Sequence, residues 1–314
     1  MLAVIFNTCG ISGEHPEQYA EAIDRILKQD FTDFKLIVSS CLNSTECSTY
    51  LKNRFGDKII INKIQERLPV NVTFNHSCLL ARDTYGDFEG YLYVDSGIFL
   101  KTSKDLGILY DLFKSDSYGM VAAQVDSDGG YLDWFGLGKD NHDSSSNHIL
   151  FENGDFVIPV GKTVNLHFQI FSRAILDFYG YLFPDIYAGH CSESVFSFVC
   201  AAIDTKFVLS KDVMVSHIQG MDGQSSGFNP STWQRNGKPT YDHPFIVNSV
   251  VEIAKSGQKF GFGYEEVRHI VDHDPDKFDG YTAKDQYLKH FIRDTQYLGN
   301  TGLFKYSQIS SEVV

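Results

Sequence analysis

"GYLYVDSGIFL", residues 90–100, is an apolar run interrupted by one carboxylate, Asp95, and by the pair Ser96-Gly97. Two interpretations fit this pattern. Aspartate and glycine are turn residues, so Asp95 could cap its own backbone at a bend. In open α/β sheets, however, ligands bind beyond the carboxyl ends of the strands. A lone acid at the end of a buried strand therefore also indicates a ligand site.

The segments before this run alternate between apolar strands and amphipathic helices. Continuous apolar runs such as LAVIF (residues 2–6) are typical of strands buried on both faces. Strand-helix alternation with short loops predicts a parallel sheet with right-handed crossovers. The expected strands are 2–6, 34–40, 58–64 and 90–97, and the expected helices are 15–29, 46–56 and 71–86.

After Asp95 the alternation is less regular, and two long glycine-rich stretches, 126–148 and 219–239, are expected as loops. A helix is expected to begin after Ser103, whose side chain is a favourable N-cap. Further strands are expected at 119–126, 163–172 and 206–218, and helices at 103–116, 173–181, 191–205, 243–257 and 283–299.

Composition and charge exclude several classes of protein. The net charge of −13 argues against nucleic acid as a partner, because binding to phosphates requires clustered Lys and Arg. No apolar run approaches the roughly 20 residues of a membrane span. The N-terminus lacks the basic region of a signal peptide. The six scattered cysteines contain no CxxC pair, so reduced thiols in a cytoplasmic protein are expected.

Two motifs of other enzyme classes are weak. A dinucleotide site needs G-x-G-x-x-G directly after the first strand, and the chain has only Gly10 and Gly13 there. The segment GQSSG, residues 223–227, matches the G-x-S-x-G nucleophile elbow around Ser225. It does not directly follow a strand, and Phe-Asn-Pro after it begins a helix poorly. A flexible loop is the favoured interpretation, with a serine hydrolase as the alternative.

The first hundred residues resemble the nucleotide-binding half of GT-A fold glycosyltransferases, particularly those of the family-2 type. Two segments carry the resemblance: YAEAIDRILKQDFTDFKLIV (19–38) and LLARDTYGDFEGYLYVDSG (79–97). In that family the fourth strand ends in Asp-x-Asp, which meets the sugar nucleotide and its metal. The resemblance is looser over residues 164–217, and the last hundred residues match nothing in the family.

The resemblance implies a nucleotide-sugar site and a divalent cation, Mn²⁺ or Mg²⁺. Such a cation would neutralise the charge that develops on the diphosphate leaving group. Asp95 would face the diphosphate or ribose and would lie near the cation, together with His217. This chain has Asp95-Ser96-Gly97 in place of Asp-x-Asp, and it has hydroxyls where the family has a base-reading acid. The implied nucleotide-sugar-binding residues are Asn7, Thr8, Ser39, Ser40, Arg82, Asp95, Ser96 and Gly97.

The second half of the chain contributes candidates for acceptor chemistry. An inverting transferase needs a carboxylate that takes the acceptor hydroxyl's proton. Glu193, at the start of an expected helix, fits this role, with Asp185 as a weaker alternative base. Glu193 could instead complement the helix dipole, and a one-residue register shift would place Ser194 at the position of the base. His217, at a strand end, is either a metal ligand or a hydrogen-bonded structural histidine.

These patterns predict an α/β protein of GT-A type, with a mainly parallel central sheet flanked by helices and a helical C-terminal extension. Residues 1–100 would form the nucleotide-sugar-binding half, 101–225 the acceptor and catalytic half, and 226–314 the extension. The predicted activity is transfer of a hexosyl or pentosyl group from a nucleotide-diphosphate donor to a carbohydrate or glycoconjugate acceptor. The alternatives are a non-catalytic nucleotide- or carbohydrate-binding protein on the same scaffold and, less favoured, a serine hydrolase that uses Ser225.

Overall fold

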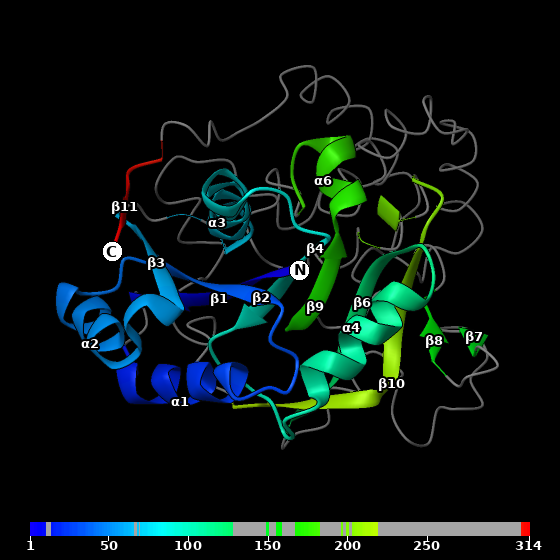
Figure 1. Ribbon diagram of the computed structural model, residues 1–314, viewed down its shortest axis with the longest axis horizontal. Coiled ribbons are helices and arrows are strands. Elements are labelled where there is room, and N and C mark those ends of the chain that lie inside the picture. The colour runs from blue at the N-terminus through cyan, green and yellow to red at the C-terminus, as the bar shows by residue number, and fades with distance from the viewer. Residues whose placement is uncertain are drawn as a thin grey trace, which may run out of the picture.

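Figure 1 shows a computed structural model of the chain. The structure describes residues 1–10, 14–65, 68, 70–127, 149–150, 155–158, 167–182, 196, 199–200, 203–218 and 309–314. Its helices are α1 (Pro16–Leu27), α2 (Thr45–Phe55), the 3-10 turn η2 (Gly56–Lys58), α3 (Val70–Tyr85), α4 (Asp105–Ser115) and α6 (Arg173–Tyr179). Its strands are β1 (Leu2–Cys9), β2 (Phe34–Cys41), β3 (Ile59–Ile64), β4 (Gly90–Asp95), β5 (Ile98–Phe99), β6 (Tyr118–Ser127), β7 (Ile149–Leu150), β8 (Phe156–Val157), β9 (Phe168–Ser172), β10 (Lys206–His217) and β11 (Ser311–Val313).

The described strands form one mixed sheet in the order β11-β3-β2-β1-β4-β9-β6-β10-β8-β7, and β5 pairs with β10. β1 to β4 run parallel to one another in the order β3-β2-β1-β4, as the alternation of strands and helices predicts. β9 enters antiparallel between β4 and β6, and β10 lies parallel to β6. Because β1, β2 and β4 are parallel, their carboxyl ends meet at one edge of the sheet.

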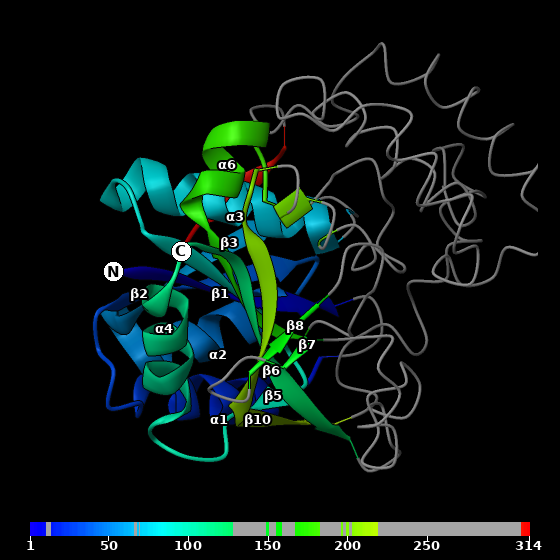
Figure 2. The ribbon, with the colours of Figure 1, turned by 90° about the vertical axis from the view of Figure 1, so that its right-hand side faces the viewer.

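Helices cover both faces of the sheet in a three-layer arrangement. α1, α2 and α4 lie on one face, and α3 and α6 lie on the other (Figures 1 and 2). The alternation of side chains along β1 explains this arrangement, because both faces of the strand are apolar. Leu2, Val4 and Phe6 join the core beneath α1, α2 and α4, while Ala3 and Ile5 face the α3 side, and all five are fully buried.

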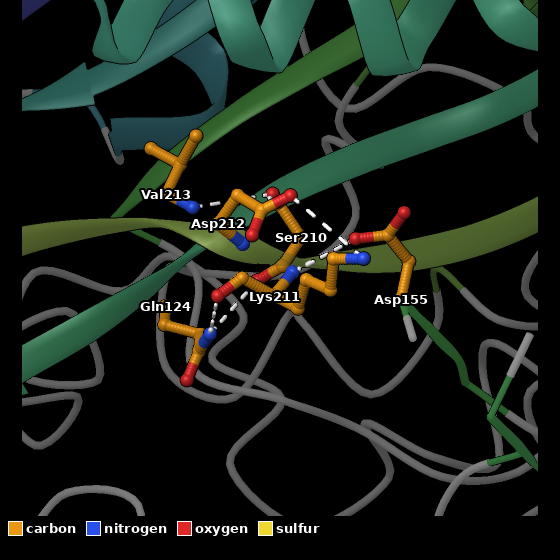
Figure 3. A network of polar contacts seen from close by, with 6 residues as sticks. All are labelled: Gln124, Asp155, Ser210, Lys211, Asp212 and Val213. Carbon is orange, nitrogen blue, oxygen red and sulfur yellow. Dashed lines mark hydrogen bonds and ion pairs between the residues drawn. The ribbon is translucent and has the colours of Figure 1, made fainter. Parts of the chain in front are cut away.

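A β-bulge interrupts β10. Leu209 pairs with Ala122 and Met214 pairs with Gln124, so five steps along β10 match two steps along β6, which leaves three extra residues on β10. Figure 3 shows how the extra residues are held: the Gln124 side chain donates to the carbonyls of Ser210 and Lys211, each at 3.0 Å. The backbone N–H of Lys211 donates to the Asp155 carboxylate at 2.9 Å. These backbone groups of the bulge therefore have hydrogen-bond partners, as expected of a β-bulge that is a regular part of the fold.

The bulge also changes which residues of β10 face the core. Before it, the even-numbered Val208 faces the α1 and α4 side, and after it the odd-numbered Val213 and Val215 do. An odd number of extra residues reverses the two-residue alternation of a strand. His217 is buried at the end of the strand, whereas Ile218 is 47% exposed. Because the bulge shifts the two-residue alternation, it decides whether Ser216 or His217 is the buried residue of this pair.

Most predicted elements up to residue 127 are confirmed, with one correction at α4. Its N-cap is Lys104, which makes no side-chain capping bond, and Ser103 instead donates to the Asp30 carboxylate at 3.0 Å. The first turn is capped from elsewhere, because the Gln29 side chain accepts from the N–H of Leu106 at 2.9 Å. In the described residues no helix is both long enough and apolar enough to cross a bilayer.

The end of the chain contributes a strand within the segment for which the sequence predicts a mostly helical extension. β11 pairs antiparallel with β3 at the edge of the sheet. Ile309 packs against Ile64, Leu68 and Val72. The remainder of the expected extension and the predicted loop at 219–239 lie outside the described residues. The division into segments 1–100, 101–225 and 226–314 stays a prediction.

Candidate functional site at the carboxyl edge of the sheet

A row of buried polar residues crosses the sheet where the parallel strands end. Asn7 on β1 lies in register with Asp95 on β4 and with Ser39 on β2. Residues directly opposite each other on neighbouring strands share a face, so these side chains lie on the face that α3 covers. All three residues are buried. A polar row of this kind in an apolar sheet is unusual, because each group must be paired or bound.

The Asp95 carboxylate has two partners, one on each oxygen. The Tyr93 hydroxyl donates to Oδ1 at 2.5 Å, and Nδ1 of His167 lies 2.5 Å from Oδ2. The backbone N–H of Asp95 also donates to the carbonyl of His167 at 3.1 Å. Ser96 and Gly97 form the turn that leads into β5, so the bend expected from the sequence is present. Among the described residues, the carboxylate is bonded to its neighbours on the sheet and not to the backbone of that turn.

His217 lies against this group. Its ring stacks on that of His167, with 4.3 Å between centroids and an angle of 20° between planes. Gly97 makes this arrangement possible. A Cβ at position 97 would lie 2.9 Å from the carbonyl oxygen of Ile218 and 3.3 Å from two ring atoms of His217. The histidine therefore occupies the space beside residue 97, the position at which the Asp-x-Asp of the resembled family would place its second acid.

The remaining predicted donor-site residues divide between the two faces. Asn7 donates to the carbonyls of Ile5 and Val94, each at 3.2 Å, and its buried Oδ1 has no hydrogen-bond partner in the described part of the chain. Ser39 donates to the carbonyl of Thr73 at the start of α3. Thr8 and Ser40 lie in register one position further along, which places them on the opposite face. Both sets nevertheless reach the same edge of the sheet.

The loop after β2 is held closely against β1. Leu42 adopts a positive φ of 55°, which is strained for a residue with a branched side chain. A Cβ on Gly10 would lie 2.3 Å from the carbonyl oxygen of Leu42, so only glycine fits there. Thr8 Oγ1 donates to Asn43 Oδ1 at 3.1 Å. Ser44, the N-cap of α2, is hydrogen-bonded through its backbone N–H and its hydroxyl to the Glu14 carboxylate.

Cys47, in the first turn of α2, has no features of a reactive thiol. Burial and the neighbouring Glu14 carboxylate raise the pKa of the Cys47 thiol to about 11. A thiol with such a pKa is protonated at neutral pH, and the thiolate is the nucleophilic form. Cys47, Cys78 and Cys200 are buried and form no disulfide bond.

The structure does not bring Arg82 to this group. It lies near the C-terminal end of α3, whereas Thr73, which contacts Ser39, lies near the N-terminal end. The step of nine residues from Thr73 to Arg82 corresponds to about 14 Å along a helix axis. The Arg82 side chain is 40% exposed and lies 3.5 Å from Asp83. Tyr85, one turn further on, stacks under Lys35 at the opposite end of β2.

The predicted bases Glu193 and Asp185, and the alternative nucleophile Ser225, lie outside the described residues. Conversely, sequence reasoning missed Tyr93 and His167. Tyr93 could have been found, because a residue two positions before Asp95 shares its face of the strand. His167 could not, because its place depends on the antiparallel pairing of β9 with β4.

The donor set fits a divalent cation only in part. Asp95 supplies a carboxylate and His217 an imidazole, which are acceptable ligands for Mn²⁺. Within the described residues, however, no cluster of three or more His, Cys, Asp or Glu side chains could hold a metal ion. A cation at this site would therefore take most of its ligands from a bound diphosphate and water, as Mg²⁺ and Mn²⁺ commonly do with nucleotides.

Comparisons with known proteins identify the fold. No protein-family model and no curated protein sequence matches the chain. Among solved structures, the mannosyltransferase PcManGT from Pyrobaculum calidifontis, in complex with GDP-Man and Mn²⁺, matches with a TM-score of 0.56 and 12% identity, covering 98% of this chain and 77% of PcManGT.

Two further solved structures agree. Residues 1–349 of S. aureus TarS match with a TM-score of 0.56 and 14% identity, covering 94% of this chain and 80% of that one. GalNAc-T7 with UDP, GalNAc and Mn²⁺ matches with a TM-score of 0.53 and 10% identity, covering 95% of this chain and 57% of GalNAc-T7. The chain therefore has the GT-A fold of these glycosyltransferases, as the resemblance of its first hundred residues predicts.

Proposed function

We propose that this protein is a glycosyltransferase, which moves a sugar from a nucleotide-diphosphate donor to a carbohydrate or glycoconjugate acceptor. The observation that carries the proposal is the buried polar row Asp95-Asn7-Ser39 at the carboxyl edge of the parallel strands. Open α/β sheets bind ligands at that edge. The solved structures with the same fold include complexes with GDP-Man and with UDP and GalNAc.

In this proposal the nucleotide lies across the ends of β1 and β2, near Asn7, Thr8, Ser39 and Ser40. The Oδ1 of Asn7, which has no hydrogen-bond partner among the described residues, is an acceptor for a ribose hydroxyl or a base N–H. Asp95 and His217 lie near the diphosphate and its divalent cation. When bound, such a cation neutralises negative charge on the leaving diphosphate.

The acceptor half of the reaction needs a base. Glu193 is the proposed residue, with Asp185 as the weaker candidate, and both stay predictions from the sequence. The base would accept the proton of the acceptor hydroxyl as that hydroxyl attacks the anomeric carbon. A hexosyl or a pentosyl donor is compatible with this scheme.

One observation favours a second candidate, a non-catalytic nucleotide- or carbohydrate-binding protein. Both oxygens of Asp95 are already hydrogen-bonded, and the space beside Gly97 is filled by His217 and Ile218. A site that lacks a second acid could bind a nucleotide without promoting transfer. Nucleotide binding is common to both candidates, and turnover distinguishes them.

The test is a thermal-shift titration with UDP, GDP, CMP and dTDP, each with and without Mn²⁺. A ligand at 100 times its dissociation constant adds about 2.7 kcal/mol to the free energy of unfolding, which gives a visible shift. We expect one nucleotide to stabilise the protein more with Mn²⁺ than without it. Asp95→Asn, which preserves the shape of the side chain, should abolish the effect of Mn²⁺.

Asp111→Ala is the matched control, because this aspartate is exposed on α4. It should behave as the wild type. If none of the four nucleotides stabilises the wild-type protein, the transferase proposal is wrong. If a nucleotide binds but the sugar nucleotides are not turned over with any carbohydrate acceptor, the binding-protein candidate replaces it.

A further inference from the structure

We propose that His167 is a positioning residue of the donor site, which holds the Asp95 carboxylate through a hydrogen bond and the His217 ring by stacking. The inference rests on the proposed function, because Asp95 and His217 matter to a ligand only if this edge binds one. It adds a residue that the sequence pattern does not single out, and it assigns that residue a role separate from direct contact with the donor.

The backbone places His167 directly beside Asp95. β9 runs antiparallel to β4, with Val94 opposite Phe168, so the next pair along is Asp95 and His167. The hydrogen bond from the Asp95 N–H to the His167 carbonyl extends the ladder by this pair. Residues opposite each other in such a ladder have neighbouring side chains on one face. The two side chains are buried, at 8% and 6% exposed.

The chemistry of the contact fixes the orientation of both groups. His167 Nδ1 and Asp95 Oδ2 share one hydrogen bond, in which the imidazole donates when the carboxylate is ionised, because an ionised carboxylate only accepts. Tyr93 donates to the other oxygen. Because each oxygen of the carboxylate has its own hydrogen-bond partner, rotation about the Cβ–Cγ bond would break both hydrogen bonds. Hydrogen bonds to charged groups are roughly twice as strong as those between neutral groups. The two hydrogen bonds therefore hold the Asp95 carboxylate firmly in one orientation.

The face of the same imidazole supports His217. The nearly parallel rings, with centroids 4.3 Å apart, are in van der Waals contact across their faces. The His217 ring also lies close to Gly97, because a Cβ there would come within 3.3 Å of two of its ring atoms. His217 is thus packed against the His167 ring and next to a glycine. One residue, His167, therefore links the two groups that the sequence assigned independently to the cation.

Two substitutions separate the two contacts. In His167→Asn (H167N), the new amide nitrogen can replace Nδ1 as the donor to Asp95, but the side chain has no ring to stack on His217. H167F keeps a flat ring beside His217 but has no donor for Asp95. If His167 only filled space in the core, the two variants would change nucleotide binding only through how well each new side chain packs. The matched control is H76N, because His76 lies on α3 and contacts Asn62 on β3, three strands from Asp95.

The experiment measures the dissociation constant of UDP and of GDP by calorimetry, with and without Mn²⁺, for the wild type and these three variants. We expect H167F to weaken binding of the nucleotide by about tenfold or more, as loss of a hydrogen bond to a charged group implies. H167N should keep nucleotide affinity within about threefold of the wild type but lose the enhancement by Mn²⁺. H76N should leave both quantities unchanged. If H167N and H167F have the same effects, including no effect, the proposal is overturned.

Crystal structures of H167N and H167F supply a test that does not depend on nucleotide binding. We expect the Asp95 carboxylate to keep its position in H167N and to rotate away in H167F. A carboxylate that stays in place in both variants would overturn the positioning role. Failure of the wild type to bind any nucleotide would instead overturn the proposed function, and the crystal structures would then decide the positioning role by themselves.

Discussion

Replacing Gly97 by alanine tests the geometry of the candidate site with the smallest possible change. The added Cβ would lie 2.9 Å from the carbonyl oxygen of Ile218 and 3.3 Å from Cδ2 and Nε2 of His217. The first distance is shorter than real Cβ contacts, and its partner is a backbone atom, which cannot move away as a flexible side chain does. Either the turn or the end of β10 must therefore shift.

The expected cost follows from two contributions. Inserting a methyl group into a well-packed region costs about 1–3 kcal/mol. The hydrogen bond from the Ile218 N–H to the Gly97 carbonyl, 3.0 Å long, lies at the same contact, and its loss would add about 0.5–1.5 kcal/mol. We therefore expect G97A to lower the free energy of unfolding by about 1.5–4.5 kcal/mol, the sum of these two effects.

Urea unfolding, followed by fluorescence, measures this change, and G107A is the matched control. Gly107 lies in α4, where an added Cβ would meet only the Cβ of Phe31, at 3.6 Å. Alanine has the higher helix propensity, so G107A should raise the free energy of unfolding by about 0.5–1 kcal/mol. G97A should also weaken the effect of Mn²⁺ on nucleotide binding, because His217 is displaced. A G97A protein as stable as the wild type would refute the close contact between residue 97 and β10.

Two further predictions concern polar groups away from the site. Gln29 is 5% exposed and caps α4 through Leu106, and its amide nitrogen donates to the carbonyls of Arg25 and Thr102. Q29L should therefore cost about 1–3 kcal/mol in urea unfolding, because these buried groups lose their partner; a Q29L protein as stable as the wild type would contradict the capping role. Hydrogen bonds from Tyr110 and Lys114 hold the pKa of the Glu89 carboxyl below its usual value of 4.5. A group with a lowered folded-state pKa contributes stability above its unfolded pKa and loses it as the pH falls through the folded one. E89Q should therefore be less stable than the wild type at pH 7, and the difference should shrink as the pH falls below 4.5 and vanish below the lowered pKa of Glu89 in the folded protein. A difference that persists throughout an acid titration would show another cause.

The sequence predicted the N-terminal half of the fold well because its signals are local. Continuous apolar runs predict β1 to β4, and amphipathic patterns predict α1 to α3. These elements form with the expected order and direction. The end of β4 was also recognised as a candidate site from its lone acid. These predictions depend on residues close together in the chain, where periodicity and turn chemistry are informative.

The parts that the sequence could not predict depend on pairings between distant segments. His167 lies beside Asp95 only because β9 inserts antiparallel next to β4, 72 residues away in the chain. Ser103 was a reasonable N-cap, but Gln29, just after α1, caps that helix from a distant part of the chain. β11 was hidden because a short edge strand is defined by its partner β3 and has little pattern of its own.

The bulge in β10 has a practical consequence for anyone who aligns or redesigns this chain. Three extra residues between Leu209 and Met214 determine which side of the sheet each later side chain of the strand faces. Deleting one of them would exchange the environments of Ser216 and His217 without altering either side chain. The position of the histidine should therefore be counted from the pairing of Met214 with Gln124, and not from the start of the strand. In comparisons with distant homologues, a gap placed one residue off in this segment would hide an equivalent histidine or create a false one.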